Sequence, residues 1–201
     1  MEKKAYHHGA LKETLIIKGI EMIYEEGIES FSLRKIAAAC EVSHTAPYKH
    51  FKNKEELLDA IMKYVMQDLS EEVLRVAKEN PNEKCLLAIG IRYVTYMMEH
   101  KDYFNLLFLG KKQAMVTIVD NHFEYEENHP FKTFVEVASK FLEEMIPDEK
   151  VRNVAILQCW STVHGLAHLL ISGMVQYEGD YAKLAESTLL SVGVGSGVCK
   201  G

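Results

Sequence analysis

Several features that mark enzymes, disulfide-rich proteins and membrane proteins are missing from this 201-residue sequence. Its four cysteines lie far apart without CxxC or CxxH spacing, so we expect neither a zinc site nor a disulfide framework. No GxSxG, HExxH, P-loop or Rossmann glycine motif occurs, which argues against an enzyme. No stretch approaches the roughly 20 apolar residues of a membrane span, and no apolar run follows the charged N-terminus. We therefore expect a soluble cytoplasmic protein without a cofactor.

The scarcity of helix-breaking residues predicts the fold class. Only four prolines and twelve glycines occur, strand-like alternation is hard to find, and apolar residues recur at helical spacing nearly throughout. We therefore predict an all-α fold of about nine helices. Their expected ranges are 10–26, 32–39, 42–51, 53–78, 83–99, 101–109, 131–145, 149–177 and 180–192. Residues 110–130 are expected to mix loop and short helix, and residues 193–201 to form a disordered tail.

A few residues mark the expected helix ends. Gly27 is placed to stop the first helix, and Ser32 to cap the second. Asn53 is expected to cap the fourth helix, with Glu56 at the reciprocal position of a capping box. Pro81 lies between two asparagines and predicts a break before the fifth helix.

The net charge of −6 is unevenly distributed along the chain. Between Ser30 and Lys54, five cations stand against the single acid Glu41, so this stretch carries a charge of +4. A basic face on an acidic body suits a protein that touches phosphate with one surface. The charge distribution alone is explained equally well by a chance cluster of cations on a solvated face.

Residues 32–51 have the composition of two packed short helices. Ile36 and Val42 offer apolar contacts between the two helices, and the small Ala37 permits a close crossing. The second helix is polar on one side and turns Phe51 toward the core. A short helix that projects in this way fits the major groove of DNA, which is about 12 Å wide.

A family resemblance covers this region. The segment SLRKIAAACEVSHTAPYKHFKNKEELLDAI, from Ser32 to Ile61, resembles the DNA-binding segment of TetR-type (tetracycline-repressor-like) regulators, and the resemblance reaches back to residues 6–9. It implies a helix-turn-helix domain over 1–60 and an effector-binding and dimerisation domain over 61–192. Glu41 departs from the pattern, because such proteins usually have glycine there. A positive φ at Glu41 would cost up to roughly 1 kcal/mol relative to glycine.

The resemblance also implies which residues contact phosphates. Tyr48 would donate its phenol, and Lys54 would combine its ammonium with the positive end of the fourth helix. Ser32 would offer its hydroxyl and nearby amides, although a plain N-cap explains it too. His50 either contacts phosphate or fixes helix packing. His7 and His8 lack a third ligand at helical spacing, so we expect an arm near DNA rather than a metal site.

A second group of residues is implied to meet base edges. Arg34 can pair with guanine through two hydrogen bonds, and Thr45 or Pro47 can press on a thymine methyl. The expected base-edge residues are Arg34, Ser43, His44, Thr45, Pro47 and Lys49.

The C-terminal part contains a further resemblance. Residues 160–165, WSTVHG, resemble a Trp/His/Gly signature of one subgroup of these regulators. Trp160 and His164 are one turn apart and share a helix face, either in the core or in an effector pocket. Gly165 would allow another helix to approach closely, as at a dimer seam.

Residues 101–108 match the helix that links the pocket to the DNA-binding domain in this family. With nearby aromatic and apolar residues they either line a cavity for an apolar or aromatic small molecule or are simply core. The candidate lining residues are Tyr93, Met97, Phe104, Leu107, Phe108, Phe141, Trp160 and His164.

The resemblance implies a repressor that binds a palindromic double-stranded operator as a homodimer and leaves it when an effector binds. The expected dimer surface is formed by residues 149–177 and 180–192. One alternative is an enzyme that uses some of the nine histidines, but no motif supports it. Another is a ligand- or protein-binding module that kept the fold and lost operator binding. The acidity and Glu41 favour this second alternative, whereas Tyr48, Lys49 and Lys54 argue against it.

Overall fold

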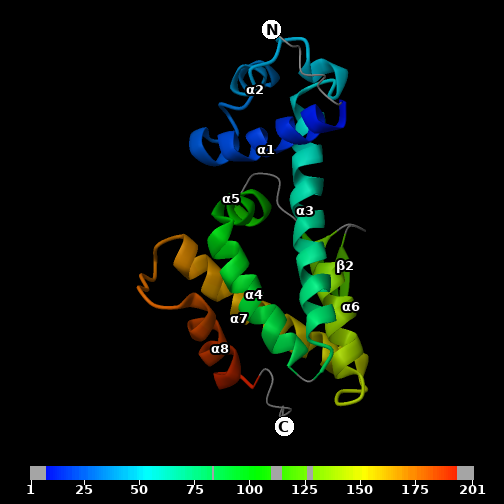
Figure 1. Cartoon of the computed structure of the whole chain (residues 1–201). Helices are drawn as coiled ribbons and strands as arrows, with labels where there is room; N and C mark the ends of the chain where they lie inside the picture. The colour runs from blue at the N-terminus through cyan, green and yellow to red at the C-terminus, as the bar shows by residue number, and fades with distance from the viewer. Residues whose placement is uncertain (1–7, 83, 110–114, 126–128, 194–201) are drawn as a thin grey trace. The chain divides into compact units, whose positions relative to one another are not determined.

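The computed structural model describes residues 8–82, 84–109, 115–125 and 129–193. These residues form eight α-helices and one two-stranded sheet, which confirms the predicted helical fold class and adds a short sheet to it (Figure 1). They divide into two compact units. The head consists of the described residues of 8–65 and 102–109, and the body of those of 66–101 and 115–193. Helix α3 (Lys54–Glu79) is shared by both units.

The head is built on α1 (His8–Glu26), α2 (Leu33–Ala39) and the first half of α3. Helix α1 also contacts the π-helical segment η2 (Asn105–Leu109), which follows the short α5 (Lys101–Phe104). Large apolar side chains from all these elements fill the centre of the head and exclude water from it. The fully or almost fully buried ones are Leu15, Phe31, Ile36, Leu57, Ile61, Phe104 and Leu107.

The predicted stop at Gly27 and the predicted caps at Ser32 and Asn53 are confirmed. Gly27 adopts a φ of 81° directly after α1, and its N–H donates to the carbonyl of Ile23 at 3.0 Å. The Ser32 hydroxyl accepts a hydrogen bond from the Lys35 amide at 3.2 Å. Asn53 Oδ1 accepts from the Glu56 amide at 2.8 Å, while the Glu56 carboxylate accepts from the Lys52 amide at 2.5 Å. These side chains satisfy amides that a helix start leaves without partners.

The body contains α4 (Cys85–Glu99), α6 (Pro130–Leu142), α7 (Glu149–Ile171), α8 (Tyr181–Ser191) and the second half of α3. Helix α4 packs closely against both α7 and α8. The core at this contact includes Val94, Val163 and Leu189. Gly90 makes the approach possible, because a Cβ atom there would lie 2.6 Å from Leu189 Cδ1 and 3.2 Å from Val163 Cγ1.

A β-hairpin replaces part of the predicted loop between residues 110 and 130. Strands β1 (Val116–Val119) and β2 (His122–Tyr125) pair in antiparallel fashion. Asp120 and Asn121 form the turn with φ values of 49° and 63°, the backbone that a two-residue hairpin loop requires. The prediction of loop and short helix was therefore wrong for 116–125, where the run of β-branched residues favours a strand. Residues 110–114 and 126–128 of that prediction lie outside the described residues.

Three other predicted helices differ in detail. The segment 101–109 changes from α-helix to π-helix at Asn105. Helix α6 ends at Leu142, a few residues before the predicted end. Helix α7 ends at Ile171 rather than near Tyr177, because Gly173 adopts a φ of 74°. Residues 194–201 of the predicted tail lie outside the described residues.

By length and composition alone, α7 is apolar enough to cross a membrane. This corrects the expectation that no stretch approaches such a span, since no Asp, Glu, Lys or Arg occurs from Asn153 to Ile171. One such helix is weak evidence for a membrane span, because helices in protein cores and interfaces have similar compositions. Only 22% of the apolar window is buried within the chain, so α7 presents much of its surface outside the fold.

Candidate nucleic-acid interface

The turn between α2 and the following segment has a defined hydrogen-bond pattern. The Val42 amide donates to the Ala37 carbonyl and the Glu41 amide to the Ala38 carbonyl, both at 3.0 Å. This pair of bonds is the Schellman motif, whose first residue after the helix adopts a left-handed backbone. Glu41 occupies that position with a φ of 55°. The positive φ considered for Glu41 on the basis of the sequence is therefore present.

The segment predicted as a helix over 42–51 is mostly a series of turns. Only Pro47–Lys49 form a regular element, the 3-10 helix η1. Pro47 provides no N–H for an internal helical bond, which explains why a longer α-helix does not form. The Ser43 and Thr45 hydroxyls lie 3.2 Å apart and hydrogen-bond to each other. Ser43 and Thr45 thus carry polar groups into the part of the chain that precedes η1.

Most of the predicted DNA contacts are exposed on this head. The exposed ones are Arg34, Ser43, His44, Thr45, Tyr48 and Lys49. Tyr48 keeps 58% of its surface accessible although it is a large aromatic residue. Pro47 is buried, so its ring does not present itself to a thymine methyl as expected, and Thr45 is the more accessible of the two. His50 is half-buried, its ring 6.4 Å from that of Phe51, a position compatible with packing.

Lys54 and Ser32 make contacts within the head. The Lys54 ammonium donates to the Ile28 carbonyl at 2.7 Å and lies 5.8 Å from the centre of the Phe31 ring. It therefore joins the start of α3 to the turn before α2. The Ser32 hydroxyl caps α2, as described above, and its residue is half-buried. Both residues have structural roles that substitution would disturb together with any contact to DNA.

Replacing Glu41 with glycine is expected to raise the free energy of unfolding by about 1 kcal/mol, because glycine adopts a positive φ without the steric cost of a Cβ atom. Chemical denaturation of the variant and of the wild type measures the difference. Glu41→Gln removes the charge but keeps the strained backbone, so it should leave stability nearly unchanged. Equal stabilisation by both substitutions would assign the effect to charge rather than to backbone strain.

Two family models match the chain. Residues 15–61 match the model described as bacterial regulatory proteins, tetR family. Residues 86–192, more than half of the chain, match the model of the tetracyclin repressor-like C-terminal domain. The chain belongs to the TetR family. Both family models, and the names of the relatives, are those of transcriptional regulators rather than enzymes.

Individual relatives match part of the chain. The class G tetracycline repressor protein of Vibrio anguillarum is 39% identical over 57 residues, which are 28% of this chain and 27% of that protein. The chain therefore spans about a third or less of the length of these curated relatives.

Solved structures resemble the whole fold. A protein of unknown function from Rhodococcus sp. RHA1 has a TM-score of 0.74 at 22% identity, with 98% of this chain and all of that chain covered. The regulator FadR from Bacillus subtilis, in complex with stearoyl-CoA, has a TM-score of 0.69 at 20% identity, with 92% and 98% covered. At these identities the likeness concerns the TetR fold alone.

The predicted effector-pocket residues of this TetR-family chain fall into two groups. Phe104, Leu107 and Phe108 belong to the head, where the first two are completely buried. The other candidates are in the body: Tyr93, Met97, Phe141, Trp160 and His164. Among them, Phe141 packs beside Val73, Val76, Cys85 and Ile89.

The body brings Tyr93, Trp160 and His164 together. The Tyr93 hydroxyl lies 2.8 Å from His164 Nδ1, and the Trp160 and His164 rings are 5.1 Å apart. Burial raises the pKa of Tyr93, so the phenol stays protonated, with a hydrogen bond from Trp160 as a smaller, opposing influence. Burial, with a smaller contribution from the charge of His168, lowers the pKa of His164 from 6.5 to about 4. At neutral pH a protonated phenol and an uncharged imidazole therefore share a hydrogen bond that joins α4 to α7.

The low pKa of His164 predicts a loss of stability in acid. The uncharged ring favours folding fully above about pH 6.5, and this contribution is lost as the pH falls toward about 4. Solvent reaches part of the ring and reduces the effect. Between about pH 7 and pH 4 we therefore expect the free energy of unfolding of the wild type to fall by about 1–2 kcal/mol more than that of His164→Gln. Denaturant unfolding of both proteins at several pH values measures this. Parallel pH profiles would contradict a neutral buried imidazole.

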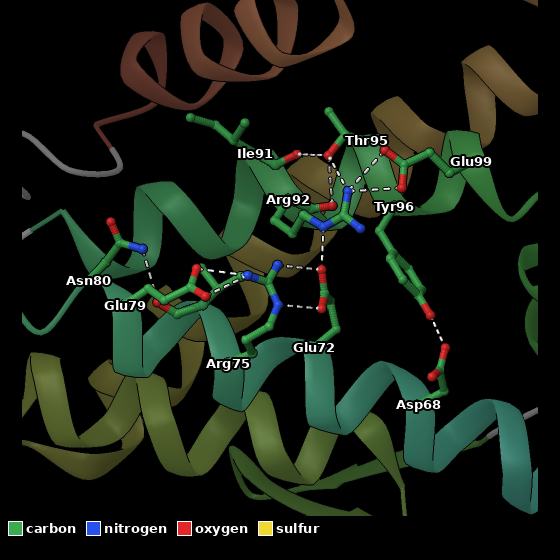
Figure 2. A network of polar contacts seen from close by, with 11 residues as sticks. Asp68, Glu72, Arg75, Glu79, Asn80, Ile91, Arg92, Thr95, Tyr96 and Glu99 are labelled. Carbon is green, nitrogen blue, oxygen red and sulfur yellow. Dashed lines mark hydrogen bonds and ion pairs between the residues drawn. The ribbon is translucent and has the colours of Figure 1, made fainter.

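Charged residues that sequence reasoning overlooked join α3 to α4 in the body. Figure 2 shows Arg92 between Glu72 of α3 and Glu99 of its own helix, with Tyr96 hydrogen-bonded to Asp68. The spacings of Glu72, Arg75 and Glu79 on α3 are helical pairings that could have been noticed. The partnership with Arg92 joins residues 20 positions apart and was not visible in the sequence.

Proposed function

We propose that this regulator is a cytoplasmic homodimeric repressor that binds a palindromic operator through residues 1–60 and is released by a small apolar or aromatic effector that binds residues 61–192. The exposed polar surface that follows the Schellman turn carries the proposal. Its side chains are held by a capped α2 and a capped α3, so their positions are fixed before DNA arrives. A preorganised surface loses less conformational entropy when it binds.

The proposed contacts divide into two kinds. Tyr48, Ser32, Lys54 and His50 would face phosphates, and Tyr48 supports this role best because its hydroxyl is on an exposed ring. Arg34, Ser43, His44, Thr45 and Lys49 would meet base edges, with Arg34 suited to guanine. Phosphate contacts set the register on the duplex, whereas base contacts select the sequence.

The proposed dimer surface is supported by an apolar stripe on α7 that the body leaves exposed. It contains Val151, Val154 and Leu169, which lie on the side opposite the buried Ile156, Val163 and Ala167, with the exposed Gln158 and Ser161 between Val154 and Leu169. Gly165 lies on the same side, and among the described residues no atom other than those of its chain neighbours and its own helix backbone would lie within 4 Å of a Cβ added there. Leu190 adds an exposed apolar side chain from α8. A second copy that pairs α7 and α8 would cover this surface as a four-helix bundle.

A two-fold dimer explains the expected operator symmetry. Two heads related by such an axis place their recognition segments in major grooves about 34–36 Å apart, or a multiple of it. An effector that binds better to a state with another spacing shifts the dimer away from DNA by its differential affinity. The B. subtilis FadR structure holds stearoyl-CoA, which supports an apolar ligand for a body of this fold. As part of this proposal, the chain belongs to the subgroup of these regulators that carries the Trp/His/Gly signature, which is formed here by Trp160, His164 and Gly165.

Operator binding by the Tyr48→Phe, Lys49→Ala double variant tests the proposed surface. Both residues are exposed, so folding should be preserved. We expect about ten-fold weaker binding to the DNA that flanks the gene, and a shallower dependence of affinity on salt, because phosphate contacts are lost. Fluorescence anisotropy across salt concentrations measures both quantities. Lys63→Ala is the matched control, since it removes one exposed cation from α3 and should bind like the wild type.

Two results would contradict the proposal. Equal affinity of the wild type for this DNA and for random duplex, followed by failure of a random-library selection, would favour a module that has lost operator binding. Equal weakening by the Lys63→Ala control would indicate an effect of net charge rather than a defined contact surface.

A further inference from the structure

The polar network between α3 and α4 carries an excess of negative charge. Figure 2 shows the carboxylates of Glu72, Glu79 and Glu99 paired with two guanidinium groups, those of Arg75 and Arg92, while the carboxylate of Asp68 accepts a hydrogen bond from Tyr96. Hydrogen bonds from Arg75 and Arg92 lower the pKa of Glu72 to about 2, so this half-buried carboxylate is ionised at neutral pH. Counted over these six side chains alone, four carboxylates and two guanidiniums carry a formal charge of −2. The network therefore attracts cations and repels anions.

Arg92 occupies the centre of this network. Its guanidinium carbon lies 5.0 Å from the centre of the Tyr96 ring, and Nη1 is 3.0 Å from both carboxylate oxygens of Glu99. Its Nε donates to Glu72 on the facing helix. An aromatic face between two carboxylates is the combination of groups that binds organic cations. Arg92 thus fills a cation-binding cradle made of Tyr96, Glu72 and Glu99.

An apolar cavity adjoins this cradle. Its volume is about 10 Å³, room for one water molecule. Glu72, Arg92 and Tyr96 line it through apolar parts of their side chains, and the remaining lining residues are Leu69, Val73, Val76, Ile89 and Tyr93. The small volume means that a larger guest must separate α3 from α4. The lining offers such a guest mainly aliphatic and aromatic contacts.

We propose that the cradle binds lipophilic organic cations, which displace the Arg92 guanidinium while their apolar groups widen the cavity. Arg92 is 28% exposed at its side chain and has the length to move its charge into water. Glu72 keeps its bond to Arg75, at 2.8 Å, when Arg92 leaves. The arriving cation replaces the charge of Arg92 between Glu72 and Glu99. Arg92 therefore acts as an internal competitor that holds the site closed when no ligand is bound.

The position of the cradle connects the ligand to DNA binding. Glu72 lies on α3, the helix that begins at Lys54 in the head. A guest that separates α3 from α4 in the body acts on a helix shared with the DNA-binding unit. This link to regulation rests on the proposed function, whereas cation binding itself does not.

Two probes of matched size and opposite charge test the site. Calorimetric titration of the full-length protein with tetraphenylphosphonium should show binding, whereas tetraphenylborate should bind at least about ten-fold more weakly. Glu99→Gln should weaken phosphonium binding about five-fold, and Arg92→Met should strengthen it about ten-fold because the competitor is gone. Glu144→Gln removes an exposed carboxylate outside the network and should have no effect.

Further variants keep the test decisive. Arg92→Lys retains the competing charge and should bind phosphonium like the wild type, which separates competition from damage to the fold. Glu99 is exposed enough that Glu99→Gln should fold even where Arg92→Met does not. Preferred binding of tetraphenylborate, or phosphonium affinity that none of these substitutions changes, would overturn the cation site. Operator binding is measured in the same preparations without probe, so a failure of the repressor proposal is detected independently of the titrations.

Discussion

Replacing Gly165 with arginine is expected to convert the dimer into monomers and to weaken operator binding about 100-fold. A side chain at this position points away from the chain's own atoms, so the monomer should fold normally. In the proposed seam, however, it would separate two closely packed α7 helices and bury a charge without a partner. A monomer binds only one half-site. It therefore loses the increase in affinity that comes from linking two half-site contacts, which is typically about 10²–10⁴-fold.

Analytical ultracentrifugation and operator titration of Gly165→Arg measure these two effects. Gly165→Ala adds a single methyl group and should preserve the dimer with a modest loss. Glu144→Arg introduces an arginine at an exposed site outside α7 and α8 and is expected to remain dimeric. If Gly165→Arg stays dimeric with full operator affinity, α7 is not the dimer seam.

Gly90→Val is expected to lower the free energy of unfolding by about 2–3 kcal/mol. Even the Cβ atom of valine would meet Leu189 Cδ1 at 2.6 Å, and its branches would add contacts with Val163. Leu189 is almost completely buried and has little room to move. The helices α4 and α8 must then separate, which opens the core of the body.

A double-mutant cycle with Leu189→Ala tests this explanation. Leu189→Ala alone should cost about 3 kcal/mol because it leaves a cavity. In the Gly90→Val background it should cost clearly less, because valine occupies part of the vacated space. Additive losses in denaturant unfolding would show that Gly90 acts through helix propensity or the unfolded chain rather than through contact with α8.

Local signals were sufficient to predict much of the fold and the exposed half of the candidate interface. The caps at Ser32 and Asn53 depend on side chains that bond to amides two or three residues away, so sequence spacing alone identifies them. The exposure of Tyr48 and Lys49 likewise follows from the polar side of a short amphipathic segment. The unusual backbone at Glu41 could be considered from the sequence for the same reason. The left-handed conformation that favours glycine in a Schellman turn is set by hydrogen bonds to residues close in the sequence.

Features that depend on contacts between distant residues were missed. The hairpin at Val116–Tyr125 was overlooked because each strand has only four residues, too few for a clear period. The burial of Pro47 and the tether of Lys54 to Ile28 come from how the head packs, which residue type does not reveal. The cradle around Arg92 requires the register of α3 against α4. Gly90 could have been suspected as a glycine inside an apolar helix, but its partner Leu189 lies on another helix.

The continuity of α3 has a consequence for how the molecule opens. Residues 54–65 of this helix pack in the head and residues 66–79 in the body, yet its hydrogen bonds run through the junction without a break. Amide hydrogen exchange should therefore report two free energies of local opening within one helix. When the head opens alone, the remaining helix begins near Met66 with amides that no capping side chain satisfies. The backbone itself thus couples the unfolding of the two units.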